Sequence, residues 1–352
     1  MSNTLSDSSV LNEHIMEVYA ANRENPISIQ RKNHIFDEIR VDVYLALKEF
    51  LPPIGLKISR IVPFGSVACN ISRTESDLDV VICIESTGFG CEDNWTRSLK
   101  NQILEHLFKN LEDYENLGHI WTAKVPILCG SKKNIKLDLS IHLGVDVPSC
   151  HISSRFLNTV TQFYPDFPIL IIFIKTIFKN RINEVTKKKE FDYPNSYTLA
   201  LMVIHFLVNQ SYIPNLHIQY ADRFDISKAT WAYEMVDKSE SQEWREKLRE
   251  TPADVFYKFL QYYINNPVTH YIIVMKRKDL VFKERYDPEG LIIEDPFDDY
   301  NPGRSLICSK IFQDCLWNLL SNIRNHHLDP KKLRETISEE QLRGYVSTKK
   351  SL

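Results

Sequence analysis

Asp77 and Asp79 are the residues of this chain whose type and spacing most directly suggest chemistry. Ten residues separate them from a Gly65-Ser66 turn, and an apolar run follows them. Side chains alternate along a strand, so both carboxylates leave the same face, where they repel each other unless a cation lies between them. Mg²⁺ prefers such oxygen ligands together with substrate phosphates, and a glycine turn lets backbone N–H groups approach a phosphate. The pattern predicts a metal-dependent site for nucleotidyl transfer.

A site that holds two metal ions needs a further carboxylate from a neighbouring strand. Residues Ile135–Leu143 alternate between apolar and polar side chains, and Asp138 lies on the polar face. An exposed strand acid would produce the same pattern, and Asp146, which lies beyond the alternation, is a rival. The upstream turn and acid pair favour Asp138. We therefore predict that Asp77, Asp79 and Asp138 form the catalytic and metal-binding set.

Composition restricts the class of protein. The chain has 352 residues, of which 43% are hydrophobic, so it should form about two globular domains. Its 43 Lys and Arg against 46 Asp and Glu give a net charge of −3, which argues against a strongly basic nucleic-acid coat. Seven scattered cysteines show neither zinc spacing nor a disulfide framework, as is typical of a reducing compartment.

Targeting and membrane signals are missing from the pattern. The N-terminus is polar, and the longest apolar run, residues 167–178, is too short to span a bilayer. We expect a soluble, cytoplasmic protein without a membrane partner, and a nuclear location stays open.

Hydrophobic periodicity predicts a mixed first part and a helical second part. Strands are expected in the first part at Leu56–Phe64, Leu78–Ile84, Ile120–Leu128 and Ile135–Leu143. Helices are expected at Val10–Ala21, Asn33–Phe50, Trp95–Leu111, Ile169–Ile182, Ser196–Val208, Asp237–Glu250, Pro252–Ile264 and Ile307–Asn325, and a loop at Tyr286–Arg304. A site is expected in the cleft between the two parts.

Six segments carry a resemblance to a known family. The Gly65-Ser66 turn, the Asp77-x-Asp79 pair and the later strand Asp138 resemble the nucleotidyltransferase superfamily of DNA polymerase β. Within it, the stretches 174–183, 195–202 and 293–305 resemble three motifs of the non-canonical poly(A) and poly(U) polymerases, the terminal nucleotidyltransferases. These motifs are the K-x-x-x-K-x-R-x-I-N helix, the S-S-Y helix and the E-D-P-F…N-x-G-R loop. The resemblance runs from about Asn33 to Asn325, in the family's order.

The resemblance implies an α+β fold with two domains. A small mixed-sheet nucleotidyltransferase, or palm, domain is expected at residues 51–148. An α-helical central, PAP-associated domain is expected at residues 10–50 and 149–328, and a disordered tail at 329–352.

It also implies nucleotide contacts beyond Gly65 and Ser66. Lys175 and Lys179, four residues apart on one helix face, would hold the triphosphate, although lysines that extend their ammonium groups to solvent give the same spacing. Tyr197 would stack on the base, and Ser196 would contact the ribose or a phosphate unless it is only the helix N-cap. In the loop, Asp295 and Tyr300 would border the base.

Two departures from the family concern the nucleotide. Tyr300 stands where uracil-selecting relatives carry a histidine, so UTP, ATP and GTP all stay open as substrates. The Asn-Thr pair that follows the third aspartate in the family is missing between Ser149 and Arg155, where a serine or a water would have to replace the ribose contact.

The activity implied by the resemblance is template-independent addition of ribonucleotides to RNA 3′ ends, with Mg²⁺ or Mn²⁺ and release of pyrophosphate. A relative that makes short or cyclic oligonucleotides, and a catalytically silent scaffold of the same fold, are the alternatives. No RNA-binding module is recognisable, so a protein partner is expected to supply the RNA.

Overall fold

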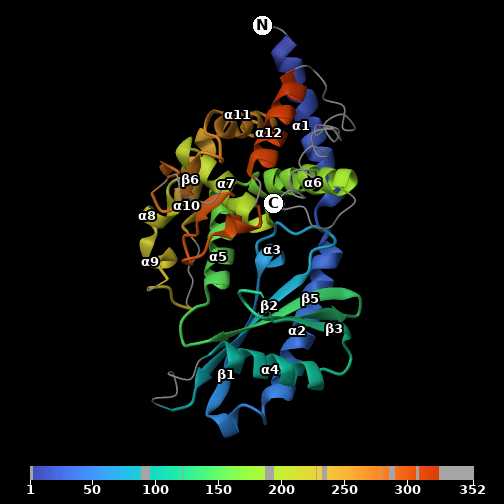
Figure 1. Cartoon of the computed structure of the whole chain (residues 1–352). Helices are drawn as coiled ribbons and strands as arrows, with labels where there is room; N and C mark the ends of the chain where they lie inside the picture. Colours follow the sequence, from blue (N-terminus) through green and yellow to red (C-terminus); the bar gives the residue numbers. More distant parts are fainter. Residues whose placement is uncertain are drawn as a thin grey trace. The chain divides into compact units, whose positions relative to one another are not determined.

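The computed structural model describes residues 3–88, 96–121, 123–186, 194–226, 228–231, 236–277, 279–284, 290–306 and 309–324. The chain divides into two compact units (Figure 1). We call Arg23–Asn158 with Asp222–Glu234 the sheet unit, and Met1–Asn22, Thr159–Ala221 and Met235–Leu352 the helical unit. Each unit is described by itself.

The sheet unit contains a five-stranded mixed sheet in the order β1-β2-β5-β4-β3. β2 and β5 pair in parallel at its centre, and the other neighbours are antiparallel. The strands are β1 (Leu56–Phe64), β2 (Leu78–Ser86), β3 (Glu115–Ile120), β4 (Ile127–Lys132) and β5 (Ile135–Leu143).

One face of this sheet carries the core of the unit. Leu78, Val80, Ile82 and Ile84 alternate along β2, are at most 2% exposed and cluster with the apolar residues of β5. Helices α2 (Pro26–Leu47) and α4 (Arg97–Asn110) contribute their buried stripes to the same cluster. Burial of each such side chain stabilises the fold by about 1.5–3 kcal/mol. The residues that alternate with them in β2, which are the partly exposed Asp79 and the buried Val81 and Cys83, lie on the opposite face.

The helical unit is built around two apolar helices, α6 (Phe167–Thr186) and α7 (Ser196–Asn209). Helices α1 (Asn3–Asn22), α11 (Pro252–Asn265) and α12 (Ser309–Arg324) pack in the same unit, and α10 (Lys238–Lys247) is its most polar helix. A small sheet in the order β7-β6-β8 completes it, with β6 (Tyr271–Val274), β7 (Asp279–Phe282) and β8 (Ile292–Glu294). Short elements are α3 (Gly65–Ala68), α8 (Leu216–Gln219), α9 (Ala221–Phe224), η1 (Pro52–Ile54) and η3 (Pro302–Ser305).

Helix α5 (Ser149–Phe163) is shared between the units, because its residues up to Asn158 belong to the sheet unit and the rest to the helical unit. The division also differs from the predicted boundaries. Helix α2, predicted with the helical part, belongs to the sheet unit because its buried stripe packs on the sheet core. The predicted tail 329–352 lies outside the described residues, and the cleft expected between the parts stays a prediction.

The predicted strand Ile120–Leu128 is wrong. Ile120 is the last residue of β3 and Ile127 the first of β4, and the two residues face each other in an antiparallel pair. The apolar residues that suggested one strand belong to the two sides of a hairpin. Likewise, the predicted loop Tyr286–Arg304 contains strand β8, whose Ile292 and Ile293 pair with β6.

Candidate active site

Asp79 and Asp138 lie side by side on the central parallel strands. In the register of β2 and β5, Asp79 is the partner of Asp138, and Leu78 is the partner of Leu137. Because the leucines belong to the core cluster, the two aspartates lie on the opposite, partly exposed face. The structure thus brings together two of the three predicted carboxylates through backbone pairing alone.

Asp77, one residue before β2, acts electrostatically on Asp138. The pKa of Asp138 is raised above its ordinary value, first by burial and then by the negative charge of Asp77. A like charge raises a carboxyl pKa only when it lies nearby, so all three predicted carboxylates belong to one neighbourhood. Such a neighbourhood favours a proton or a cation.

Gly65 fixes the position of the turn against Asp79. Its φ of +73° lies in the left-handed region, and a Cβ on this residue would collide with the Asp79 carboxylate. The residues that follow form the single helical turn α3 rather than an open turn. Only glycine satisfies both conditions, so the backbone approaches the carboxylate more closely than any side-chain-bearing residue would allow.

Helix α5 holds this turn in place. The backbone N–H of Gly65 donates to Ser154 Oγ at 3.0 Å, and the Ser154 hydroxyl donates to the Cys150 carbonyl at 2.9 Å. At the other end of α3, Asn158 Nδ2 donates to the Ala68 carbonyl at 2.8 Å. The Gly65 amide is therefore already hydrogen-bonded within the protein.

Sequence reasoning missed the contributions of Ser154 and Asn158. The family motif places its asparagine between Ser149 and Arg155, so the sequence pointed to the serines of this stretch only as replacements for that asparagine and did not point to Asn158. Asn158 lies one helical turn beyond Ser154 and shares its helix face. Helical periodicity through this segment was the signal that would have connected the two residues.

Asp146 is placed differently from Asp138. Its Oδ1 lies 3.2 Å from His142 Nε2, and its side chain is 59% exposed in the segment after β5. Gly144, with φ +147°, approaches Asp146 rather than Asp79. The strand register favours Asp138 over Asp146 as the third carboxylate.

The donor set of Asp77, Asp79 and Asp138 fits a hard divalent cation, because it consists of carboxylate oxygens in a partly solvated neighbourhood. Within the described ranges, no three His, Cys, Asp or Glu side chains converge closely enough to hold a metal ion as they stand.

In the helical unit, the predicted base-contacting residues lie together. Tyr197 Oη donates to Asp295 Oδ1 at 3.1 Å, and the buried Asp295 also accepts the Phe297 N–H at 2.9 Å. The N-cap of α7 is Asn195, which accepts the Thr198 N–H at 2.8 Å. The alternative that Ser196 is the N-cap is therefore wrong, and Ser196 is a residue of the first helical turn.

The loop after β8 is organised by Asn301. Its Oδ1 accepts the N–H groups of Ile293 and Gly303 at 3.0 and 2.8 Å, and its Nδ2 donates to the Leu291 carbonyl. The Pro302 carbonyl accepts from Asn195 and Thr198 of α7, which joins the loop to the same helix end as Tyr197.

Tyr300 lies beside this loop with the Arg304 guanidinium 3.9 Å from its ring centroid. Its pKa is raised, first by burial, with Arg304 opposing this and Asp298 and Asp295 adding to it. One ring face is therefore occupied by a cation, and the phenol is neutral at physiological pH.

Lys175 and Lys179 both lie on α6, as predicted. Lys175 is only 7% exposed, so most of its side chain is buried. The side chain of Lys179 lies outside the described residues.

No single helix of the described residues is long and apolar enough to cross a membrane. The pair Ser149–Phe163 and Phe167–Phe178, bent by 114°, meets the length and composition criteria together. Most residues from Phe167 to Phe178 are buried in the helical unit.

Together, the mixed sheet, the neighbouring strand aspartates and the glycine turn define a nucleotidyltransferase palm domain. Residues 11–152 match the family model described as "Poly(A) RNA polymerase, mitochondrial-like, central palm domain". This match agrees with the recognition made from the motifs: residues 11–152 are similar to the palm domain of the non-canonical poly(A)/poly(U) polymerases.

Solved structures extend the likeness over most of the chain. The GLD-2/RNP-8 complex gives a TM-score of 0.68 at 22% identity, over 93% of this chain and 98% of that chain. The structure of mtPAP in complex with UTP gives a TM-score of 0.69 at 16% identity, over 93% of this chain and 72% of that chain. The structure of Cid1 in complex with the UTP analogue UMPNPP gives a TM-score of 0.61 at 18% identity, over 88% of this chain and 92% of that chain. No curated protein matches this sequence significantly.

Proposed function

We propose that this protein adds ribonucleotides to RNA 3′ ends without a template. The observation that carries the proposal is the pairing of Asp79 with Asp138 on adjacent strands, with Gly65 held against Asp79. The RNA 3′-hydroxyl oxygen attacks the α-phosphorus of a nucleoside triphosphate. The bond from this phosphorus to the bridging oxygen breaks, and pyrophosphate leaves.

Asp138 is the carboxylate best suited to accept the hydroxyl proton. Its raised pKa makes it a stronger base than an ordinary aspartate. Mg²⁺ or Mn²⁺ would be held by Asp77, Asp79 and Asp138 and would supply charge stabilisation for the reacting phosphate. A solved structure of a Cid1 variant bound to MgATP, 17% identical to this chain, supports the choice of a divalent cation.

The helical unit contributes the proposed nucleotide contacts. Lys175 and Lys179 bind the triphosphate, and Tyr197, oriented by its hydrogen bond to Asp295, stacks on the base. From the sheet unit, Ser66 contacts the phosphates, and Gly65, whose amide is bonded to Ser154, shapes the turn that brings Ser66 to them. A protein partner supplies the RNA, by analogy with GLD-2, whose solved structure is a complex with RNP-8.

The decisive experiment incubates pure protein and an RNA oligonucleotide with each of the four ribonucleoside triphosphates and Mg²⁺ or Mn²⁺. Extension by the wild-type protein and loss of extension by orders of magnitude in Asp79→Asn and Asp138→Asn support the proposal. Products that form without RNA indicate an oligonucleotide-synthesising enzyme instead. No product from a folded wild-type protein indicates a silent scaffold, and near-normal activity of Asp138→Asn would bring Asp146 forward.

Base selection is proposed to be weak, with UTP and ATP as comparable substrates and GTP as a possible third. The neutral phenol of Tyr300, partly covered by Arg304, cannot provide the fixed donor of an imidazole. Tyr300→His should shift preference toward UTP by the equivalent of one hydrogen bond, roughly 0.5–1.5 kcal/mol. Exclusive use of one base that this substitution leaves unchanged would assign selection to other residues, with Asp295 and Asp298 the next to test.

A further inference from the structure

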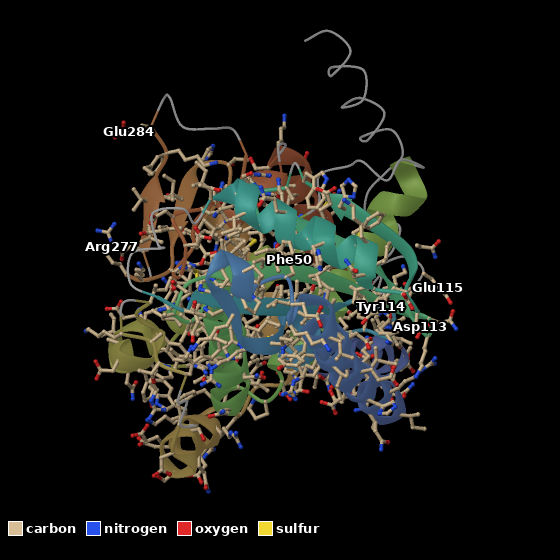
Figure 2. The ribbon with its side chains drawn as sticks, turned by 90° about the horizontal axis from the view of Figure 1, so that it is seen from below. Phe50, Asp113, Tyr114, Glu115, Arg277 and Glu284 are labelled. Atoms are coloured by element: carbon tan, nitrogen blue, oxygen red, sulfur yellow. The ribbon has the colours of Figure 1, made fainter. Side chains whose placement is uncertain are left out.

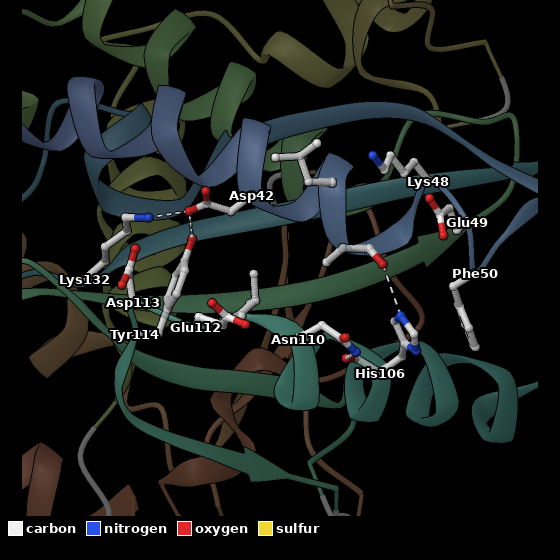
Figure 3. A pocket seen from close by; sticks show the side chains of 13 residues that line it. Asp42, Lys48, Glu49, Phe50, His106, Asn110, Glu112, Asp113, Tyr114 and Lys132 are labelled. Atoms are coloured by element: carbon white, nitrogen blue, oxygen red, sulfur yellow. Dashed lines mark hydrogen bonds and ion pairs between the residues drawn. The ribbon is translucent and has the colours of Figure 1, made fainter.

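A pocket of about 590 Å³ lies in the sheet unit, and its lining does not include Asp77, Asp79 or Asp138 (Figure 3). Its walls come from the end of α2, the end of α4 and the segment that leads into β3, with Lys132 of β4. In the sheet register, Lys132 shares its face with Leu128, a member of the core cluster, whereas Asp79 and Asp138 lie on the other face. The pocket is therefore separate from the proposed catalytic site.

The charged groups on the inner wall of the pocket are paired with each other. Lys132, only 5% exposed, forms an ion pair with Asp42, and its Nζ lies 4.7 Å from the Tyr114 ring centroid. Tyr114 Oη donates to Asp42 Oδ2 at 2.9 Å. A buried lysine already paired with a carboxylate attracts an anionic ligand only weakly. The wall is a fixed support rather than an anion site.

Two aromatic rings form the other end. Phe50 and His106 are stacked with centroids 4.0 Å apart, and His106 Nε2 lies 3.1 Å from the Ala46 carbonyl, which fixes the imidazole. Both residues are half-buried. A planar cation such as a guanidinium stacks favourably on an exposed aromatic face.

The rim carries an excess of carboxylates. Glu49, Glu112 and Asp113 are exposed, and no residue that the structure describes forms an ion pair with any of them. Lys48 is the one cation among the exposed lining residues. In the view from below, Asp113 and Glu115 lie at one edge of the unit beside Tyr114, and Phe50 lies nearer the centre (Figure 2). The rim therefore attracts cations and repels RNA phosphates.

An apolar helix face continues from the pocket. Val41, Tyr44 and Leu45 of α2 are more than half exposed, and their spacing places them on the same face as Lys48. Leu45 and Lys48 also line the pocket. Large apolar side chains next to a charged recess are typical of protein interaction surfaces, where arginine is enriched.

We propose that this pocket binds an arginine-bearing basic segment of a partner protein. An arginine guanidinium stacks on Phe50 and His106 beside Glu49, and further basic side chains of the same segment meet the carboxylates of Glu112 and Asp113 toward the other end of the pocket. Apolar residues of the same segment cover the exposed face of α2. The charge of the rim identifies a basic protein segment, not RNA, as the occupant.

The test measures binding of a fluorescent hexa-arginine peptide at two salt concentrations, with hexalysine and hexaglutamate peptides for comparison. The double variant Glu112→Lys, Asp113→Lys should weaken hexa-arginine binding about tenfold, equivalent to about 1.4 kcal/mol. Phe50→Ala should weaken binding of the arginine peptide more than that of the lysine peptide, because it removes a stacking surface. Melting temperatures confirm that each variant is folded.

The matched control changes two exposed acids of the helical unit, Glu246→Lys with Asp279→Lys, and so alters the net charge equally. This control should change peptide binding less than about twofold. Equal weakening by both double variants would overturn the proposal, because binding would then follow net charge alone. Failure of hexa-arginine to bind the wild type would also overturn it. RNA extension does not depend on this pocket, so the result is independent of the proposed activity.

Discussion

At the scale of single residues, Gly65 has the least freedom of any position in the candidate site. Its φ of +73° costs an ordinary residue about 1–2 kcal/mol, and a Cβ would displace the Asp79 carboxylate. We predict that Gly65→Ala lowers nucleotidyl transfer at least tenfold and destabilises the sheet unit by about 1–2 kcal/mol. Primer extension and thermal unfolding measure the two effects.

Gly88→Ala is the control for this substitution. Gly88 does not have a left-handed φ, and an added Cβ would meet nothing within 4 Å. The control should behave like the wild type. Equal activity of both alanine variants would show that the close approach of the turn to Asp79 is not needed.

Asp77 raises the pKa of Asp138, and this link gives a prediction for stability against pH. Because the folded-state pKa of Asp138 lies above its ordinary value of 3.8, the folded state holds this proton more tightly than the unfolded state. The resulting stability is present at low pH and is lost as the pH rises through the raised pKa. Near neutral pH, the ionised Asp138 is therefore a cost to the fold.

Asp77→Asn removes the second cause of that cost, the neighbouring charge, and leaves burial unchanged. We predict a higher melting temperature than wild type at neutral pH without divalent cations, a difference that shrinks at acid pH, and loss of activity. Calorimetry across the pH range measures the difference, with the exposed Glu75→Gln as control. An Asp77→Asn protein less stable than wild type at neutral pH would contradict the inferred repulsion.

At the scale of elements, α5 holds both ends of the glycine turn, through Ser154 at Gly65 and Asn158 at Ala68. Ser154→Ala would leave the Gly65 N–H without its acceptor, at a cost of about 1–3 kcal/mol where the group stays buried. We predict a fall in kcat larger than the change in KM for the nucleotide, because the turn would move relative to Asp79. Steady-state kinetics separate the two constants.

Two further variants decide between positioning and general stability. Ser153→Ala removes a hydroxyl that donates to the Ser149 carbonyl in the preceding turn at 2.8 Å, and it should have the smaller effect on kcat. Ser154→Thr keeps the hydroxyl and should restore kcat. If Ser154→Ala lowers only the melting temperature, α5 stabilises the fold without positioning the turn.

The elements also show which features the sequence could predict. Strand Ile135–Leu143 has the predicted bounds because its strict alternation matches a half-buried strand, and the same alternation placed Asp138 on the correct face. The β3–β4 hairpin and β8 were missed, since short apolar runs carry no signal for where one strand ends. The Ser154–Gly65 and Tyr197–Asp295 hydrogen bonds join residues about 90 positions apart or more, and local periodicity contains no information on such contacts.

At the scale of the whole molecule, the charge balance separates catalysis from RNA capture. A net charge of −3 and the acidic rim beside Phe50 give RNA little general attraction. Exposed cations occur locally, such as Arg60, whose guanidinium stacks on Trp231 at 4.8 Å within the sheet unit. A chain of this kind should hold an RNA strand through few phosphate contacts and should depend on a partner for affinity.

This reasoning predicts weak, mildly salt-dependent binding of single-stranded RNA by the isolated protein. For single strands, log K falls with log salt with a slope of about −0.7 for each phosphate neutralised, so few contacts give a shallow slope. Fluorescence anisotropy with a labelled oligonucleotide over a salt series measures it, and Arg60→Ala should make the slope shallower still. Tight binding with a steep slope would contradict the prediction. It would mean that clustered cations outweigh the net charge, so that the protein captures RNA without help.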